Sequence, residues 1–285
     1  MLTRQSCARQ IRNSISGPRR KSVPDNVVAW PGSVHPRIFK KKTDLFDVSP
    51  SVLRSGLFRD EADVRLASTY LLAGVPSDVP LIIAWTAKAG RTVGTRTTVV
   101  MRAVNRRGED DIKIARTFTR GQARTWSVEH TYFAMADRHR GGAARRMMRA
   151  SVEIYDRLGI GRITVHANID VGGYVWAKLG FAATDPAHIR AELAEALEDD
   201  PGSVLFTEAN RVADESDDDD LMYNLARLEI EGLHSCGKSL LRGAHWYGHA
   251  TLKDPRHRAR LARHFAPEHD DTRSNTAGGG EGEHA

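Results

Sequence analysis

The sequence predicts a mixed α/β (α+β) fold with a mostly antiparallel sheet flanked by helices, followed by a mainly helical C-terminal extension. Four β-rich runs follow one another between residues 79 and 136, with turn residues between them. Between 142 and 181, two stretches with apolar residues at helical spacing enclose one short strand-like run. After 185, most apolar residues follow helical spacing. Strands grouped ahead of alternating helices and strands are typical of mixed folds.

The N-terminal part is predicted to be poorly structured. Residues 1–24 carry six arginines or lysines and no acid, and residues 25–50 contain several prolines, which favour irregular structure. We therefore expect residues 1–50 to form a basic disordered arm and an irregular lead-in. The composition of the arm also fits an organelle transit peptide, and this alternative stays open.

The first helix and the four strands are expected next. A helix is predicted within 51–75, ending at Gly74 and Pro76, and its apolar positions at helical spacing include Val64, Leu66, Tyr70 and Leu71. The β-rich runs predict an antiparallel meander with strands at 79–87, 95–104, 110–120 and 126–136.

Beyond the meander, the pattern predicts a helix at 142–160 that ends at Gly159, a strand at 162–168 and a helix at 172–181 that ends at Gly180. Residues 184–265 are expected to form a C-terminal extension packed on the core. Its helices are predicted at 185–200 and 221–233, with the acidic run 214–220 as a linker or helix lead-in. The last residues, 266–285, are predicted to be a disordered tail.

Composition narrows the function classes. The net charge is +6, which favours anionic partners such as phosphate-bearing ligands or nucleic acid. Two cysteines make a disulfide framework improbable and favour a reducing compartment, so a cytoplasmic location is expected. No run approaches the roughly 18 apolar residues that would cross a membrane.

Two stretches of the sequence are candidates for phosphate binding. Residues 232–239, "GLHSCGKS", fit the written pattern of a P-loop, which needs a buried strand before it and a helix after it. The apolar residues ahead of Gly232 follow helical spacing instead, so a P-loop is not expected here.

The second stretch, "RHRGGAARRMM" at 138–148, stands between a predicted strand and a predicted helix. Gly141 and Gly142 let the backbone approach a ligand closely. The free N–H groups and the dipole of the helix N-terminus favour an anion. The residues therefore predict an anion site at this strand–helix connection, and a plain glycine-containing turn on a basic surface is the alternative.

Here the sequence resembles the GNAT acetyltransferase superfamily. Arg138-His-Arg-Gly141-Gly-Ala143 fits the family's pyrophosphate motif R/Q-x-x-G-x-G/A, and "GGYVWAKLGF" is similar to the family's helix that ends in K-x-G-F. Between them lies a strand ending in Ala167-Asn168. The resemblance covers residues 51–183, which we expect to form a GNAT-like acyl-CoA-binding domain.

The resemblance implies a mostly antiparallel sheet whose fourth and fifth strands splay apart to hold acetyl-CoA. It also implies an N-acyltransferase that moves the acetyl group to an amine of an unidentified acceptor, either a small molecule or a protein. The residues implied to contact acetyl-CoA are Phe133, Ala134, Met135, Arg138, Arg140, Gly141, Gly142, Ala143, Ala144, Asn168 and Trp176.

The candidate catalytic residues are Glu129, His130 and Tyr174. Glu129 and His130 lie on one strand, point to opposite faces and can each act as a base if desolvated. A salt-bridged glutamate and a structural histidine are the alternatives. The resemblance implies a tyrosine as the acid that protonates the leaving thiolate, but Trp176 stands at the usual position, so Tyr174 is the substitute.

Trp176 and the long extension motivate a second hypothesis, in which the domain has lost catalysis and serves as a binding or assembly module, including homo-oligomers. A third hypothesis is nucleic-acid binding by the basic arm and by residues 253–264. No metal site is predicted. A zinc set can be drawn from four residues, but the set is uncommon and Gly248 interrupts it: His234, Cys236, His245 and His249.

Overall fold

The computed structural model describes residues 44–88, 97–105, 112–121, 125–135, 142–167 and 172–265. It confirms the mixed α/β class and a mostly antiparallel sheet. The described residues divide into two compact units between His166 and Ala167, whereas the sequence placed the domain boundary after residue 183. Within the described ranges, no helix is both long and apolar enough to cross a membrane.

Unit 1 is built on a six-stranded run of sheet in chain order. Its strands are β1 (Leu45–Val48), β2 (Leu81–Lys88), β3 (Thr97–Asn105), β4 (Ile112–Arg120), β5 (Trp126–Met135) and β6 (Ile160–Ala167). Strands β2 to β5 form the predicted antiparallel meander, while β1 pairs in parallel with β2 and β6 in parallel with β5. The sequence predicted irregular structure at β1, because a four-residue strand shows too little alternation to be recognised.

The helices of unit 1 are α2 (Pro50–Arg54), α3 (Glu61–Leu71) and α4 (Ala143–Leu158). The single helix predicted within 51–75 is interrupted at Gly56, whose φ is +77°, and α3 begins again at the N-cap Asp60. Leu66, predicted on the apolar face, is 41% exposed. The predicted end of α4 is confirmed, since Gly159 adopts the left-handed conformation with φ +69°.

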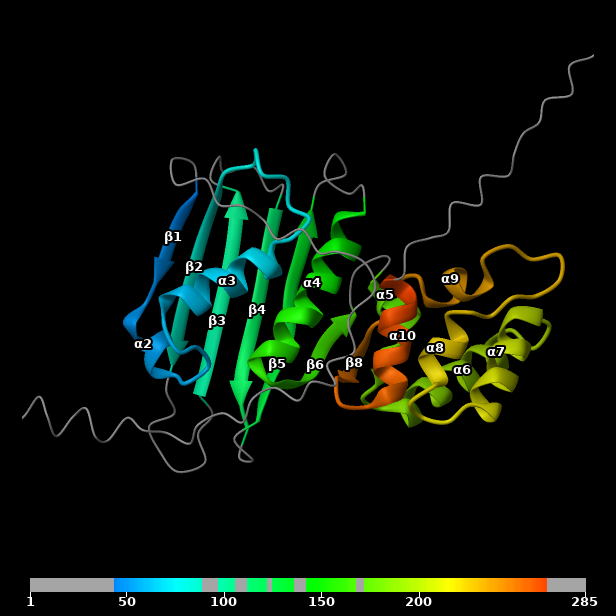
Figure 1. Ribbon diagram of the computed structural model, residues 1–285. Helices are drawn as coiled ribbons and strands as arrows, with labels where there is room; N and C mark the ends of the chain where they lie inside the picture. The colour runs from blue at the N-terminus through cyan, green and yellow to red at the C-terminus, as the bar shows by residue number, and fades with distance from the viewer. Residues whose placement is uncertain are drawn as a thin grey trace, which may run out of the picture. The chain divides into compact units, whose positions relative to one another are not determined.

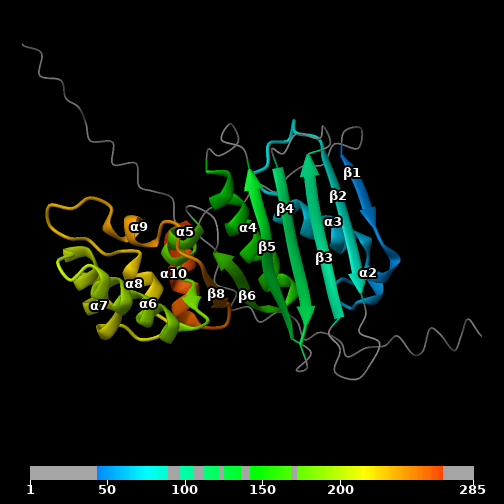
Figure 2. The same cartoon turned by 180° about the vertical axis from the view of Figure 1, so that it is seen from behind.

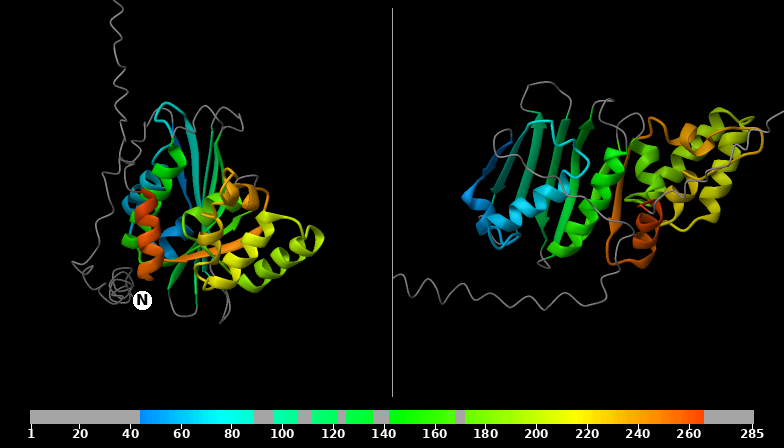
Figure 3. Two further views of the ribbon diagram at one scale, coloured as in Figure 1. Left: turned by 90° about the vertical axis from the view of Figure 1, so that its right-hand side faces the viewer. Right: turned by 45° about the horizontal axis from the view of Figure 1, so that its top comes forward.

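The core of unit 1 lies between the sheet and the helices. Figures 1 and 3 show α3 and α4 side by side on one face of the sheet. An aromatic chain runs through this core, from Phe58 to Trp85 (5.1 Å between ring centroids), to Phe118 (5.7 Å) and to Tyr155 (6.1 Å). In Figure 2 the opposite face of the sheet is toward the viewer, and no described helix of unit 1 covers it. The inward side chains of the meander therefore anchor α4, which begins at the candidate site.

Unit 2 is mainly helical, as expected. Its elements are α5 (Gly172–Lys178), β7 (Ala182–Ala183), α6 (Pro186–Asp199), α7 (Val204–Glu215), α8 (Leu221–Leu225), α9 (Cys236–Leu241), β8 (Trp246–Thr251) and α10 (Pro255–Phe265). The helix predicted over 221–233 is wrong in extent, because α8 ends at Leu225 and a tight turn follows, with Ile230 bridged to Leu233. The helix predicted at 185–200 is confirmed within one residue at each end, and the helix predicted at 172–181 begins as expected but ends three residues earlier, at Lys178.

Candidate functional site

The candidate site lies in unit 1, where β5 leaves β6. The parallel register of the two strands runs from Trp126↔Ile160 to His130↔Val165, whereas β5 continues to Met135. In the described residues, Thr131 to Met135 have no paired partner on β6. Figure 2 shows the two arrowheads well apart. Among the described residues, the backbone groups of this strand end that face β6 therefore have no partner in the sheet.

A β-bulge stands at the point of separation. Ala115 of β4 is paired with Tyr132, but Thr117 is paired with Glu129, so Arg116 lies opposite both His130 and Thr131. Such an extra residue bends the strand and re-aims the side chains after it. Thr131 and Tyr132 are consequently both exposed, although they are neighbours in the chain.

The first turn of α4 follows in the chain. Gly142 is its N-cap in the left-handed conformation (φ +68°), without a side-chain cap, and the first turn contains no acidic residue. The N–H groups of that turn lack intrahelical partners, and the helix dipole favours an anion near them. Gly74 packs against this turn, since a Cβ on it would lie 2.5 Å from the carbonyl oxygen of Ala143.

The predicted acetyl-CoA residues fall into three groups. Phe133, Ala134 and Met135 lie at the end of β5 and stay paired with β4 on their other side. Gly142, Ala143 and Ala144 form the start of α4, where Ala143 is buried and Ala144 is exposed. Four further residues predicted to contact acetyl-CoA lie outside the described ranges: Arg138, Arg140, Gly141 and Asn168.

Glu129 and His130 point to opposite faces of β5, as expected. Glu129 is exposed, whereas His130 is buried and its Nε2 lies 2.9 Å from the Tyr155 hydroxyl. Burial, and then the charge of Arg116, hold the pKa of His130 well below its usual value. Burial raises the pKa of Tyr155 to about 12. His130 is therefore a neutral core histidine at pH 7, while the Glu129 carboxylate faces solvent.

Arg116 is a residue that the sequence reasoning missed. Its side chain is buried beside His130 and Tyr155, in the layer between β4 and α4. The sequence carried a usable pattern, because Ile112, Ile114, Arg116 and Phe118 occupy alternate positions of β4 and all are buried. An arginine at an inward position of an alternating strand could thus have been identified.

Tyr174 and Trp176 lie on α5 in unit 2, whereas Glu129 and His130 belong to unit 1. Tyr174 is half-buried and its ring lies 5.6 Å from the Lys178 ammonium nitrogen. Trp176 packs edge-on against Phe181, at 5.1 Å between ring centroids. Its indole is therefore part of the packing of unit 2.

Gly173, near the start of α5, has a packing cause. A Cβ on Gly173 would lie 2.5 Å from the carbonyl oxygen of Leu241 and 3.0 Å from that of Ala244. Only a glycine lets α5 approach the chain between α9 and β8 this closely. Gly173 is thus explained without a ligand.

The stretch "GLHSCGKS" lies in a different setting from that of a P-loop. Helix α8 precedes it, α9 begins within it at Cys236, and no strand of the described residues leads into it. A cavity of about 540 Å³ lies around it, lined by Tyr174 and by residues between 226 and 238. Its charged side chains are of both signs: Arg227, Glu229, Glu231 and Lys238. Nothing in this lining singles out a phosphate.

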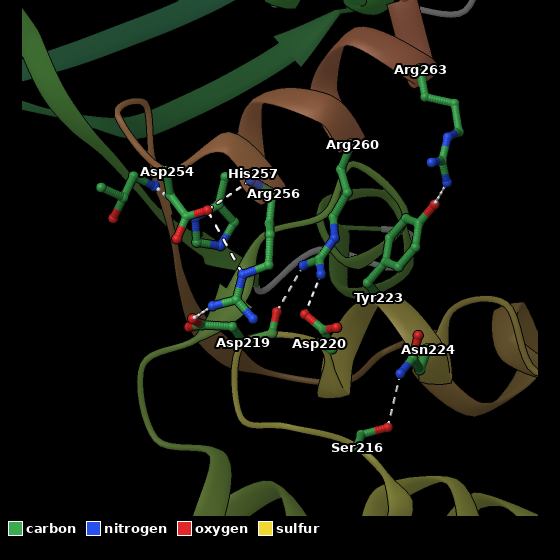
Figure 4. A network of polar contacts seen from close by, with 11 residues as sticks. Ser216, Asp219, Asp220, Tyr223, Asn224, Asp254, Arg256, His257, Arg260 and Arg263 are labelled. Atoms are coloured by element: carbon green, nitrogen blue, oxygen red, sulfur yellow. Dashed lines mark hydrogen bonds and ion pairs between the residues drawn. The ribbon is translucent and has the colours of Figure 1, made fainter.

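Arginines of unit 2 pair with several acids of the run 214–220, and Figure 4 shows those that meet Asp219 and Asp220. Arg260 of α10 contacts the Asp220 carboxylate and donates to the Asp219 carbonyl oxygen (2.9 Å), while Arg256 pairs with the Asp219 carboxylate (2.8 Å). Arg190 of α6 pairs with Asp218 (2.7 Å). Two arginines of the basic segment 253–264, Arg256 and Arg260, are thus paired with acids of the protein itself. Separately, no group of acids, histidines or cysteines in the described parts can hold a metal ion.

Comparisons with known proteins found no relative of this chain: no family model, no curated protein and no solved structure matches it.

Proposed function

We propose that the chain is a GNAT-like N-acyltransferase that moves an acetyl group from acetyl-CoA to an amine. The observation that carries the proposal is the end of β5, which leaves β6 after His130 and is followed by the uncapped first turn of α4. This supports the splayed strands and the anion site that the sequence resemblance implies.

The two parts of the site suit the two parts of the ligand. An extended chain with amide groups can hydrogen-bond to an unpaired strand edge as an added strand does. The pantetheine arm of acetyl-CoA is such a chain, and Thr131–Met135 offer such an edge. The pyrophosphate needs N–H donors and a positive dipole, which the first turn of α4 supplies.

In the proposed reaction the amine nitrogen bonds to the thioester carbonyl carbon, and the carbon–sulfur bond breaks. A base takes the proton from the amine, and an acid returns one to the leaving thiolate. Glu129 suits the role of base, because its side chain is exposed and an amine can reach it. His130 is shielded from solvent, so it would have to act through Tyr155. Tyr174 is the proposed acid.

Ala144→Glu tests the anion site with the fold preserved. Ala144 is exposed in the first turn of α4, where a carboxylate stabilises the helix dipole. The same carboxylate repels a pyrophosphate, so we expect the affinity for acetyl-CoA, measured by titration calorimetry, to fall about tenfold or more.

Ala144→Gln is the matched control, with nearly the same shape and no charge, and it should bind within about threefold of the unmodified chain. Equal affinities of the glutamate and glutamine variants would refute an anion site at this turn.

A second candidate function is a catalytically inactive binding or assembly module. The packing of Trp176 against Phe181 favours it, because an indole has no acidic proton to give a thiolate. This alternative predicts no acetyl transfer to any amine and a stable complex with a partner or a second copy. Sedimentation of the purified chain, with and without acetyl-CoA, separates the two functions.

A further inference from the structure

A charged group that has no counter-charge among the described residues lies under the bulge of β5. Arg116 is 1% exposed, and its guanidinium donates to the carbonyl oxygens of Ala115 (2.9 Å) and Tyr132 (3.0 Å) and contacts the Met147 sulfur (3.9 Å). Its Nε is buried without a hydrogen-bond partner, and no carboxylate in the described parts of the chain pairs with it.

Such a group does not serve stability. Taking a guanidinium out of water is costly, and neutral acceptors repay less of that cost than a carboxylate does. An apolar side chain of similar volume would fill the same space without the penalty, and such replacements of buried charges are often stabilising. Burial also lowers the pKa of Arg116, although an arginine keeps its proton at neutral pH.

The contacts of Arg116 join three parts of the site. Ala115 lies on β4, Tyr132 lies on β5 directly after the bulge, and Met147 lies on α4 one turn after Ala143. One guanidinium therefore bridges the two strands where their regular pairing is interrupted. It also reaches the helix whose first turn forms the anion site.

We propose that Arg116 is a positioning residue that fixes the bulge of β5 and thereby sets the place of Thr131–Met135. The proposal rests on the proposed function, because Thr131–Met135 is the segment proposed there to hold the pantetheine arm of acetyl-CoA. A residue that only fills the core would contribute to stability and leave the strand end unchanged.

The test compares Arg116→Met, which keeps the volume without charge or N–H donors, with Arg116→Lys, which keeps the charge and one donor group. Three quantities are measured on the full chain: the urea midpoint, the amide hydrogen exchange of residues 131–135, and the affinity for acetyl-CoA. For Arg116→Met we expect an unchanged or higher midpoint, faster exchange at 131–135, and an affinity reduced about tenfold. Arg116→Lys should restore part of the affinity and of the protection.

Two results overturn the proposal. One is an Arg116→Met chain with unchanged exchange at 131–135. The other is a loss of urea midpoint in both variants with exchange accelerated throughout unit 1, which is the behaviour of a core filler. If the unmodified chain does not bind acetyl-CoA, the proposed function fails, and the exchange at 131–135 alone still decides the role of Arg116.

Discussion

Replacing Gly74 by alanine should destabilise unit 1 through two separate effects. Gly74 has φ +104°, a conformation that an L side chain adopts only under strain. The added Cβ would also lie 2.5 Å from the carbonyl oxygen of Ala143 and 3.2 Å from its Cα, which are backbone atoms of the first turn of α4. The chain after α3 must therefore move away from α4.

The expected loss of stability is the sum of two costs, one for the positive φ and one for the close contact with Ala143. Positive φ in a non-glycine residue costs about 1–2 kcal/mol, and overpacking against a fixed backbone adds about 1–3 kcal/mol. We expect a loss of about 3 kcal/mol in the free energy of unfolding. At roughly 4 °C per kcal/mol, the midpoint of thermal unfolding should fall by about 12 °C. Urea denaturation and scanning calorimetry measure the two quantities.

Gly159→Ala is the matched control. Gly159 has φ +69°, but a Cβ on it would meet nothing within 4 Å, so only the conformational cost of about 1–2 kcal/mol applies. The difference between the two variants isolates the contact with Ala143. Equal losses in both variants would refute the close packing of Gly74 on the start of α4.

Two further predictions concern the contribution of buried titratable or charged side chains to the free energy of unfolding. His130 has a depressed pKa in the native state, so below pH 6.5 the unfolded chain binds a proton that the native chain does not. Stability should therefore fall with decreasing pH by up to about 1.4 kcal/mol per unit, and His130→Phe should remove this part of the slope in urea titrations at pH 7.5 and 5.5. Tyr155, with its raised pKa, and the arginine Arg116 do not titrate in this range; identical slopes in the two chains would contradict the account. In unit 2, Arg260→Met leaves the Asp220 carboxylate without its partner and should cost about 2 kcal/mol, whereas Arg211→Met, which breaks only exposed pairs, should change little. Similar losses in the two arginine variants would show that the pair of Arg260 and Asp220 in Figure 4 contributes no more than an exposed pair does.

Much of the fold could be predicted, because local patterns determine it. Strands β2 to β4 alternate inward and outward residues, as β5 does before its bulge, and α4 combines helical spacing with a glycine at its end. Strand β1 could not be predicted, since its pairing with β2 joins residues some distance apart in the chain. The break between α2 and α3 was missed because helical spacing continues across Gly56.

The sequence predicted the elements that form the candidate site, but not how they are arranged. The sequence indicates which residues end β5 and begin α4, but the bulge and the last pair with β6 depend on register, which neighbouring strands decide together. Arg116 was missed for a related reason. Its position in β4 is inward, but nothing local shows that its guanidinium would meet Tyr132 and Met147.

A calorimetric titration of the full chain with acetyl-CoA, run beside a titration with Mg-ATP, decides whether the end of β5 and the start of α4 bind an acyl-CoA. We expect binding of acetyl-CoA that is weakened about tenfold or more in Ala144→Glu and stays within about threefold in Ala144→Gln, with no binding of Mg-ATP. Absence of acetyl-CoA binding would contradict the account, and binding of Mg-ATP alone would move the phosphate site to "GLHSCGKS" in unit 2.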